Sequence, residues 1–389
     1  MTIVVGTGPA GLTAAYLLAK RGEKVTVIDK AKQPGGLWRG FDYGTHHFET
    51  GMHWYSDAGI SEIDEFWWNL LPFEDLHLIP REIAGCWWNG KLQTNSPYPD
   101  VRGGLEFSNR PVLEKIWGVP IEELAPYADK LVKIDRGVAY DAHQTAIAYE
   151  ADPRSREMLA WPDQRTLPVQ YQSGRRSFYP KKGLIELVTQ AMIRLSDMGV
   201  EFHLGRSFAD FAHHRDDRVV WASGLKPACD AHGIPWPSDM TPPRRLTVVN
   251  ALVDIGAMRH VAHLREDHAD LHYAFDYEPD NDRFRVTWYH GVTHDRNDRR
   301  VTVELLGDYS GLQGEITAKC MNFGSMDHVL GVHDLGPILP VPTVKNEALL
   351  EGVRYELGRK KNLTVIGSGA KPGLFFQPEI MAHLHEAIA

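Results

Sequence analysis

The chain has 389 residues, enough for two or three domains, and its 43% hydrophobic and 24% charged residues are typical of a folded globular protein. A formal net charge of −9 excludes the basic surface that a nucleic-acid-binding protein presents to phosphates. The three cysteines, Cys86, Cys229 and Cys320, are widely separated, which argues against a disulfide framework and a zinc cluster. No segment offers the roughly 18 uninterrupted apolar residues of a membrane-spanning helix, so we expect a cytoplasmic protein.

The N-terminal segment predicts a βαβ unit. Residues 2–5 form a short apolar, β-branched run typical of a buried strand. A glycine-rich turn follows, and residues 12–20 have the apolar spacing of a buried helix. Residues 24–28 predict a second strand that ends at Asp29.

The turn has the G-x-G-x-x-G spacing of a dinucleotide-binding site. Gly6, Gly8 and Gly11 would allow, in that order, the tight turn, the approach of backbone to a pyrophosphate and close packing of helix on strand. Pro9 and Ala10 complete the turn into the helix, whose free N–H groups favour an anion. Asp29, followed by Lys30, ends the second strand at the distance where a carboxylate accepts hydrogen bonds from ribose hydroxyls.

The rest of the chain predicts helices and strands in three stretches. We expect helices over residues 61–70, 110–117 and 121–134, with Ser61 and Asp64 as a capping box, and then irregular chain to about residue 177. A helix over 183–198 and strands over 200–204 and 218–221 resume the α/β alternation. Residues 246–255, 271–277, 284–291 and 301–306 predict a second sheet of antiparallel character. A helix over 345–358, a strand over 363–366 and a final helix from about residue 378 complete the chain.

Further motifs carry a resemblance to a known family. Gly35 and Gly36 follow Asp29 closely, and Gly36-Leu37-Trp38 leads to Gly44-Thr45-His46-His47-Phe48. With these motifs the chain resembles the FAD-binding superfamily that includes amine oxidases, phytoene desaturases, protoporphyrinogen oxidase and UDP-galactopyranose mutase. Segments 110–125, 179–187, 337–342 and 365–367 are also similar to segments of that superfamily.

The resemblance implies an α/β fold of the glutathione-reductase-like flavoprotein type, in which a Rossmann-type FAD-binding domain carries an inserted α+β substrate domain. The implied FAD-binding parts are residues 1–75, 178–240 and 336–389. Residues 76–177 would form a helical cap and residues 241–335 a substrate-domain sheet. Besides the first turn, the residues that it implies beside FAD are Gly36, Leu37, Trp38, His46, His47, Phe48, Phe208, Gly367, Ser368, Gln377 and Ile380. In particular, the final helix near Gln377 would direct its N-terminus at the isoalloxazine.

At two points the chain departs from members of that superfamily, and both departures reduce the number of activities that we expect. Where mutases of this kind have tyrosine pairs and an arginine that bind a sugar-nucleotide diphosphate, this chain has two apolar pairs and a serine. These residues are Ile338 and Leu339, Phe375 and Phe376, and Ser368. The sequence also lacks a second glycine motif for NADPH, which favours oxygen or an electron carrier as the acceptor.

Candidate chemical groups cluster near the implied flavin face. His47, flanked by His46 and near His53, is the preferred acid or base, with a hydrogen-bonded packing role as the alternative. Trp54, Phe375 and Phe376 are candidate substrate contacts, although tryptophan more often belongs to a core. The remaining histidines lack partners at a ligand spacing, so we expect no metal.

The sequence therefore predicts an FAD-dependent oxidoreductase of the oxidase or desaturase type, which transfers a hydride from a small-molecule metabolite to flavin N5. The alternatives are a mutase-like, non-redox isomerase that uses reduced FAD and a non-catalytic FAD-binding protein. The sequence does not specify the substrate or the oligomeric state.

Overall fold

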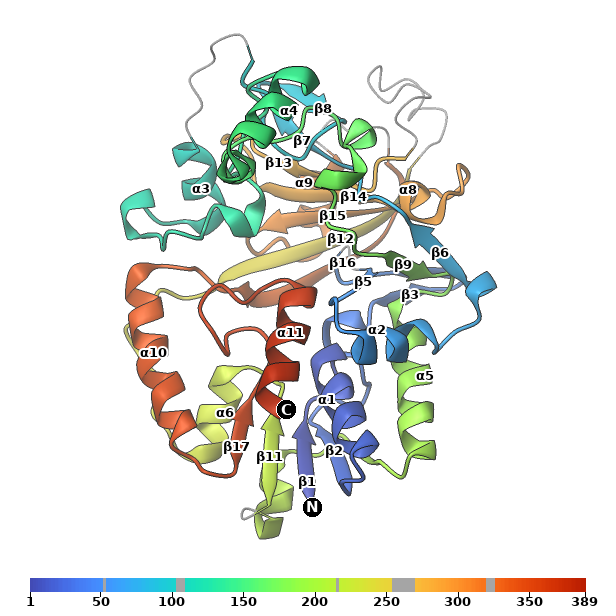
Figure 1. Cartoon of the computed structure of the whole chain (residues 1–389), viewed down its shortest axis with the longest axis vertical. Coiled ribbons are helices and arrows are strands. Elements are labelled where there is room, and N and C mark those ends of the chain that lie inside the picture. The colour runs from blue at the N-terminus through green and yellow to red at the C-terminus, as the bar shows by residue number, and fades with distance from the viewer. Residues whose placement is uncertain (52–53, 103–108, 215–216, 254–269, 320–325) are drawn as a thin grey trace.

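The computed structural model describes residues 1–51, 54–102, 109–214, 217–253, 270–319 and 326–389 (Figure 1). The predicted βαβ unit is confirmed as β1 (Thr2–Val5), α1 (Pro9–Lys20) and β2 (Val25–Asp29). The strands β10 (Glu201–Leu204), β11 (Arg218–Trp221) and β17 (Leu363–Val365) join them in a five-stranded sheet of order β10-β2-β1-β11-β17. All neighbouring strands are parallel.

Helices cover both faces of this sheet, which explains why β1 is apolar along its whole length. Val4 belongs to the core on the face of α1, α5 (Leu184–Asp197) and α11 (Gln377–Ile388). Ile3 and Val5 point to the opposite face, toward α6 (Leu225–His232) and α10 (Val344–Gly358). The two-residue period of the strand therefore divides these side chains between two cores.

The second large sheet has seven strands in the order β16-β12-β15-β14-β13-β7-β8 and lies above the parallel sheet in Figure 1. It confirms the predicted antiparallel character for all but one pairing, since β13 and β7 run parallel. Its strands are β7 (Ala84–Trp88), β8 (Lys91–Gln93), β12 (Arg244–Val253), β13 (Tyr273–Asp276), β14 (Arg283–Trp288), β15 (Arg300–Leu306) and β16 (Met326–Leu339). Asn89 and Gly90 form the tight β7–β8 turn with φ of 51° and 72°.

Smaller elements connect the two large sheets. β5 (Tyr55–Ser56), β9 (Ser177–Pro180) and β6 (Leu76–Ile79) form one small sheet, and β3 (Phe41–Tyr43) pairs with β4 (His46–Phe48). The remaining α-helices of the described chain are α2 (Ser61–Trp68), α3 (Arg110–Trp117), α4 (Ala142–Ala151), α8 (Tyr289–Thr293) and α9 (Leu312–Lys319). No helix in the described ranges combines the length and the apolar character needed to cross a membrane.

The sequence prediction was wrong for residues 121–134. Instead of one helix, the chain forms the short 3-10 helices η3 (Ile121–Glu123) and η4 (Lys130–Val132). Pro126 lies between them, and proline cannot donate the hydrogen bond that a continuous helix requires. The predicted irregular stretch after residue 134 was wrong too, because it contains α4, which Asp141 caps by accepting a hydrogen bond of 2.8 Å from Gln144 N.

The predicted capping box at α2 was also wrong in one of its two members. The residue that caps α2 is Ile60, and Ser61 makes no capping hydrogen bond. Asp64 instead holds the chain that leads into the helix: its carboxylate accepts from the backbone N–H of Ala58 at 2.7 Å and of Gly59 at 3.0 Å. It also accepts from the Tyr55 hydroxyl at 2.6 Å, so this buried acid links α2 to β5.

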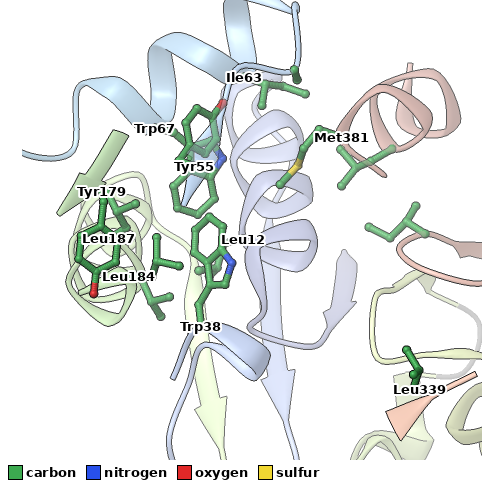
Figure 2. Close-up of a cluster of buried hydrophobic side chains, with 14 of the residues drawn as sticks. Leu12, Trp38, Tyr55, Ile63, Trp67, Tyr179, Leu184, Leu187, Leu339 and Met381 are labelled. Carbon is green, nitrogen blue, oxygen red and sulfur yellow. The ribbon is translucent and has the colours of Figure 1, made fainter. Parts of the chain in front are cut away.

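A continuous aromatic and aliphatic core joins α1, α2 and α5 (Figure 2). Trp38 is 4% exposed and meets Trp67 edge to face, with ring centroids 5.2 Å apart. Leu12 of α1 and Leu187 of α5 complete this part of the core. Trp38 therefore packs in the core, which was the alternative expectation for the tryptophans.

Candidate functional site

The first glycine turn has the close contacts that its spacing predicts. Gly6 has φ +111°, a conformation that side chains rarely adopt, and a Cβ there would lie 2.6 Å from Ser223 Oγ. A Cβ on Gly11 would lie 2.0 Å from the carbonyl oxygen of Gly6. A Cβ on Gly8, in contrast, would meet no atom within 4 Å. Glycine is thus required at positions 6 and 11 because a side chain there would clash with neighbouring atoms of the protein. At Gly8 the absent side chain instead leaves open space beside the N-terminus of α1.

This open space suits a phosphate group. Pro9 is at the start of α1 and Gly8 caps it without a side-chain hydrogen bond. The first turn of the helix contains no acidic side chain. The free N–H groups and the positive end of the helix dipole therefore face outward without a competing carboxylate, as an anion-binding turn requires.

Asp29 lies at the end of β2, beside this turn. Its Oδ2 accepts hydrogen bonds from Thr7 N at 2.8 Å and Thr7 Oγ1 at 2.6 Å, and its Oδ1 accepts one from Ala31 N at 2.9 Å. Thr7 is fully buried, and its Oγ1 also accepts a 3.3 Å hydrogen bond from Gly35 N. Thr7 thus fixes the acid against both glycine turns, a role that the spacing of the motif does not reveal.

The second glycine pair lies against the first turn. Gly35 and Gly36 both have positive φ, +107° and +57°, and a Cβ on Gly36 would lie 3.5 Å from Gly8 Cα. Leu37, the next residue, is 54% exposed and lines the cavity described below, while Lys30 is near Asp29 at the end of β2. The chain thus brings two glycine turns and one carboxylate to the same edge of the parallel sheet.

The C-terminal residues of the predicted site reach the same edge. A Cβ on Gly367 would lie 3.7 Å from Ala222 O, and Ala222 also packs beside Gly11; Ser368 follows on the surface. Gln377 begins α11 and accepts a 3.0 Å hydrogen bond from Ser56 N, while its buried Nε2 has no hydrogen-bond partner in the described chain. Ile380 lies one turn further along α11 and is partly buried.

His47 lies in a polar cluster instead of an open pocket. Its side chain is 10% exposed, and Nδ1 lies 2.7 Å from Asp42 Oδ1 while Nε2 lies 3.4 Å from Glu49 Oε1. A Cβ added to Gly40 or Gly183 would come within 2.5 Å of the imidazole, so backbone encloses the ring. Burial lowers the pKa of His47, but the hydrogen bonds and charges of Glu49 and Asp42 outweigh burial and raise that pKa.

Other predicted residues near the flavin pack within the chain. Phe48 is fully buried and contacts Tyr289 edge to face, with centroids 5.6 Å apart, and His46, two residues earlier, is partly exposed. Phe208 is buried against Trp221, with centroids 5.6 Å apart. His53 lies outside the described residues.

A cavity of about 1100 Å³ is lined by residues of the seven-stranded sheet, of the small β5-β9-β6 sheet and of the start of α11. It is large enough for a drug-sized molecule, since ligand cavities commonly measure about 300–1,000 Å³. Its lining brings together five of the predicted residues, namely Leu37, Trp54, Phe375, Phe376 and Gln377. It also includes Ile338 and Leu339, the apolar pair at which mutases have tyrosines.

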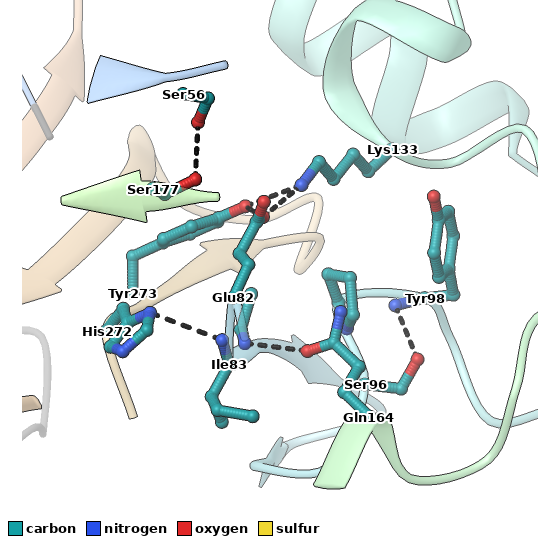
Figure 3. A network of polar contacts seen from close by, with 12 residues as sticks. Ser56, Glu82, Ile83, Ser96, Tyr98, Lys133, Gln164, Ser177, His272 and Tyr273 are labelled. Carbon is teal, nitrogen blue, oxygen red and sulfur yellow. Dashed lines mark hydrogen bonds and ion pairs between the residues drawn. The ribbon is translucent and has the colours of Figure 1, made fainter. Parts of the chain in front are cut away.

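The lining of the cavity also contains a polar cluster that the sequence did not predict (Figure 3). The Glu82 carboxylate accepts hydrogen bonds from Lys133 Nζ and from the Tyr273 hydroxyl, and Lys133 Nζ lies 2.7 Å from that hydroxyl. Burial tends to raise the pKa of Glu82, but Lys133 and Tyr273 outweigh it and lower the pKa, so the carboxylate is ionised. Beside them, Arg136 stacks on the ring of Tyr98 at 4.4 Å.

We name Glu82, Tyr98, Lys133, Arg136 and Tyr273 the Glu82 cluster. Its members come from separate segments: the β6–β7 connection, the chain after β8, the end of η4 and β13. No motif joins such distant positions, and only the tertiary structure places them together. Within the described ranges, no group of three histidine, cysteine or acidic side chains is arranged to hold a metal.

Comparisons with known proteins agree with this architecture. The model of the NAD(P)-binding Rossmann-like domain family matches residues 4–70. Hydroxyneurosporene desaturase of Rubrivivax gelatinosus is 62% identical over 113 residues, which are 27% of this chain and 20% of the desaturase. L-amino-acid oxidase of Daboia russelii is 38% identical over 63 residues, 16% of this chain and 11% of the oxidase. The chain thus spans at most a fifth of the length of these curated relatives.

Two solved structures share the fold over the whole chain. Reduced UDP-galactopyranose mutase superposes with a TM-score of 0.66 at 13% identity and covers 100% of this chain and 94% of the mutase. A protein described as a putative protoporphyrinogen oxidase from Exiguobacterium sp. has a TM-score of 0.60 at 14% identity, with 100% and 97% coverage. The comparisons thus show an N-terminal Rossmann-like dinucleotide-binding domain and a fold that the chain shares with these two structures.

Proposed function

We propose that the protein is an FAD-dependent oxidoreductase of the oxidase or desaturase type that acts on a small molecule in the cavity. The observation that carries the proposal is the arrangement around Gly8: an open, acid-free helix N-terminus with Asp29 and a second glycine turn beside it. The desaturase and oxidase relatives, each similar to a part of this chain, support a redox reaction. Bound FAD would accept a hydride from the substrate and pass the electrons to oxygen or to a carrier.

The residues of the chain have distinct tasks in this proposal. The turn from Gly6 to Gly11 binds the pyrophosphate, and the lone pairs of Asp29 not used by Thr7 and Ala31 accept from the adenosine ribose. The free Nε2 of Gln377 and the N-terminus of α11 supply hydrogen-bond donors beside the ring system. The cavity walls orient the substrate and exclude water from it.

The N-terminal family model is named for NAD(P), and the chain offers a reason to favour FAD. The lining of the cavity includes Leu37, which follows the second glycine turn, and Gln377, which begins α11. A prosthetic group that extends from the first turn past these residues would reach the cavity. A dinucleotide of this reach with a ring system at the cavity wall is what the FAD-binding members of the superfamily hold.

The first test is the absorption spectrum of the purified protein, in which we expect the two bands of oxidised flavin. A metabolite panel added anaerobically should then bleach these bands without a reductant. Turnover that requires prior reduction by dithionite would instead indicate an isomerase. Colourless protein that does not take up added FAD would refute the proposal.

A matched pair of variants tests the pyrophosphate site. Gly8→Val places a side chain in the open space without a clash inside the protein, because Gly8 has the ordinary φ of −67°. We expect this variant to fold with an unchanged unfolding midpoint and to lose FAD. Gly352→Val is the control, since Gly352 in α10 is also free of neighbours within 4 Å, and it should retain FAD.

A further inference from the structure

The cavity has an apolar wall that the protein leaves uncovered. Six large apolar side chains of this wall are between 37% and 65% exposed. They are Leu37, Phe73, Leu78, Ile338, Phe375 and Phe376. Exposed apolar side chains that line one cavity favour the binding of a ligand there, because covering them with apolar atoms is favourable in free energy.

The same cavity also collects positive charge. Among its described lining residues, six side chains are cationic and only Glu82 and Glu304 are anionic, although the whole chain has a net charge of −9. The cationic residues are Arg81, Lys133, Arg136, Arg175, Arg176 and Arg285. A cleft lined by one sign of charge focuses the electrostatic field and attracts ligands of the opposite sign.

Only some of these cations are neutralised by carboxylates. Lys133 pairs with Glu82, Arg285 pairs with Glu304 at 2.6 Å, and Arg176 pairs with Asp57 at 2.8 Å. Arg136 pairs with Asp135 at 3.5 Å, whereas the described residues provide no carboxylate within 4 Å of Arg81 or Arg175. An excess of positive charge therefore remains after pairing.

The phosphates of a dinucleotide do not account for this excess. None of the three glycines of the first turn lines the cavity, whereas all six cations do. Lys133 and Arg136 come from the chain around η4, outside the βαβ unit. The charge thus belongs to the part of the cavity that is left for a substrate.

Lys133 is held in a conformation that lysine seldom adopts. Its φ of 54° is left-handed, at the end of η4 where glycine is the residue without strain. The Tyr277 hydroxyl lies 2.8 Å from Val132 O and 3.0 Å from Lys133 O and fixes this turn. The turn directs the Lys133 side chain, 22% exposed, to Glu82 in the cavity. A strained residue held in place at a cavity indicates that its side chain has a function.

We propose that the cavity binds an organic anion, whose apolar body lies against the Leu37 and Phe375 wall and whose charged group is bound by Lys133 and Arg136 of the Glu82 cluster. This inference deepens the proposed function, on which it rests, by naming the substrate class of the same cavity. Burial raises the pKa of Tyr98 despite the nearby Arg136, so its phenol stays protonated and can donate to the same anion. Glu82 holds Lys133 in place and weakens the anion site by its own charge.

Three probes of equal size test the sign of the charge: phenylacetate, neutral phenylacetamide and cationic phenethylamine. Calorimetry on the FAD-loaded protein should give phenylacetate at least about tenfold tighter binding than the amide, as one charge-assisted hydrogen bond provides. Equal binding of the three, or tightest binding of the amine, would overturn the proposal. The same titration on flavin-free protein separates the proposed anion site from the proposed redox function. If the protein takes up no FAD but still binds phenylacetate, only the redox function is refuted.

Two variants with opposite expected effects locate the anion site. Lys133→Met should weaken phenylacetate binding about tenfold and leave phenylacetamide unchanged. Glu82→Gln should tighten phenylacetate binding, since it removes the competing negative charge. The control Lys345→Met removes a cation that is paired with Asp239 away from the cavity lining, and should change neither. Tighter phenethylamine binding by Lys133→Met with unchanged phenylacetate would contradict the site. If Lys133→Met does not fold, Arg136→Gln replaces it with the same expectation.

Discussion

Thr7 offers a sharp test of how the acid of the dinucleotide site is held. Its hydroxyl donates to Asp29 Oδ2 at 2.6 Å and accepts from Gly35 N at 3.3 Å, so one buried atom links β2 with both glycine turns. Thr7→Val replaces that hydroxyl with a methyl group of nearly the same shape and keeps the β-branched side chain. The variant therefore removes two hydrogen bonds and little else.

The expected losses of stability and of FAD affinity follow from the hydrogen bonds that Thr7→Val removes and from those that it keeps. A hydrogen bond to a charged group contributes about 1.5–3 kcal/mol, so the free energy of unfolding of flavin-free protein should fall by about 2 kcal/mol. The Asp29 carboxylate keeps its bonds to Thr7 N at 2.8 Å and Ala31 N at 2.9 Å, and therefore stays in place with more freedom. We expect FAD affinity to fall by only about tenfold, which corresponds to about 1.4 kcal/mol.

Urea unfolding followed by tryptophan fluorescence measures the first quantity, and titration of flavin-free protein with FAD measures the second. Thr7→Ser is the control, because it keeps the hydroxyl and should retain most of the stability and affinity. If Thr7→Val matches the wild type in both measurements, the hydroxyl does not position Asp29 and the reasoning fails.

Three further predictions concern the fold around the site. Gly11→Ala forces a Cβ to within 2.0 Å of Gly6 O, and the resulting overpacking should lower the free energy of unfolding by about 1–3 kcal/mol, measured in urea; an unchanged value would refute the close contact. Asp64→Ala removes the acceptor of the Tyr55 hydroxyl and of the backbone N–H groups that precede α2, so we expect the free energy of unfolding to fall by about 3 kcal/mol; an unaltered unfolding midpoint would be the contrary result. The pKa of His47 is raised in the folded protein, so its stabilising contribution is present below the unfolded pKa of about 6.5 and is lost as the pH rises through the folded value. His47→Asn should flatten this part of the stability profile measured between mildly acidic and mildly alkaline pH, and an identical profile would contradict the ion-pair cluster.

The βαβ unit could be predicted because its determinants are local. The strand β1, the three glycines and Asp29 act within one short segment, and the close contacts of Gly6 and Gly11 are those that the spacing of the motif predicts. The prediction of helices and strands failed at two places where single prolines and glycines altered the apparent pattern. Pro126 interrupted the apparent helix over residues 121–134, and the glycines and Pro337 in β16 concealed an edge strand of the larger sheet.

The candidate site divides in the same way. Motif spacing placed Gly8 and Asp29 at a dinucleotide site and resemblance placed Gln377 near it, while no feature of the sequence revealed that Thr7 bridges the two turns. The preferred histidine, His47, lies enclosed between two backbone segments and beside Glu49, a contact between residues that a sequence motif does not specify.

The sequence by itself determined the nucleotide-binding unit and the alternation of elements, because hydrophobic period, turn chemistry and glycine spacing act over a few neighbouring residues. The tertiary structure alone decided the cavity and its charge. Glu82, Lys133 and Tyr273 are brought together by the packing of a connection, a 3-10 turn and a strand that are far apart along the chain. Their combined field depends on distances in space, which the order of residues does not contain.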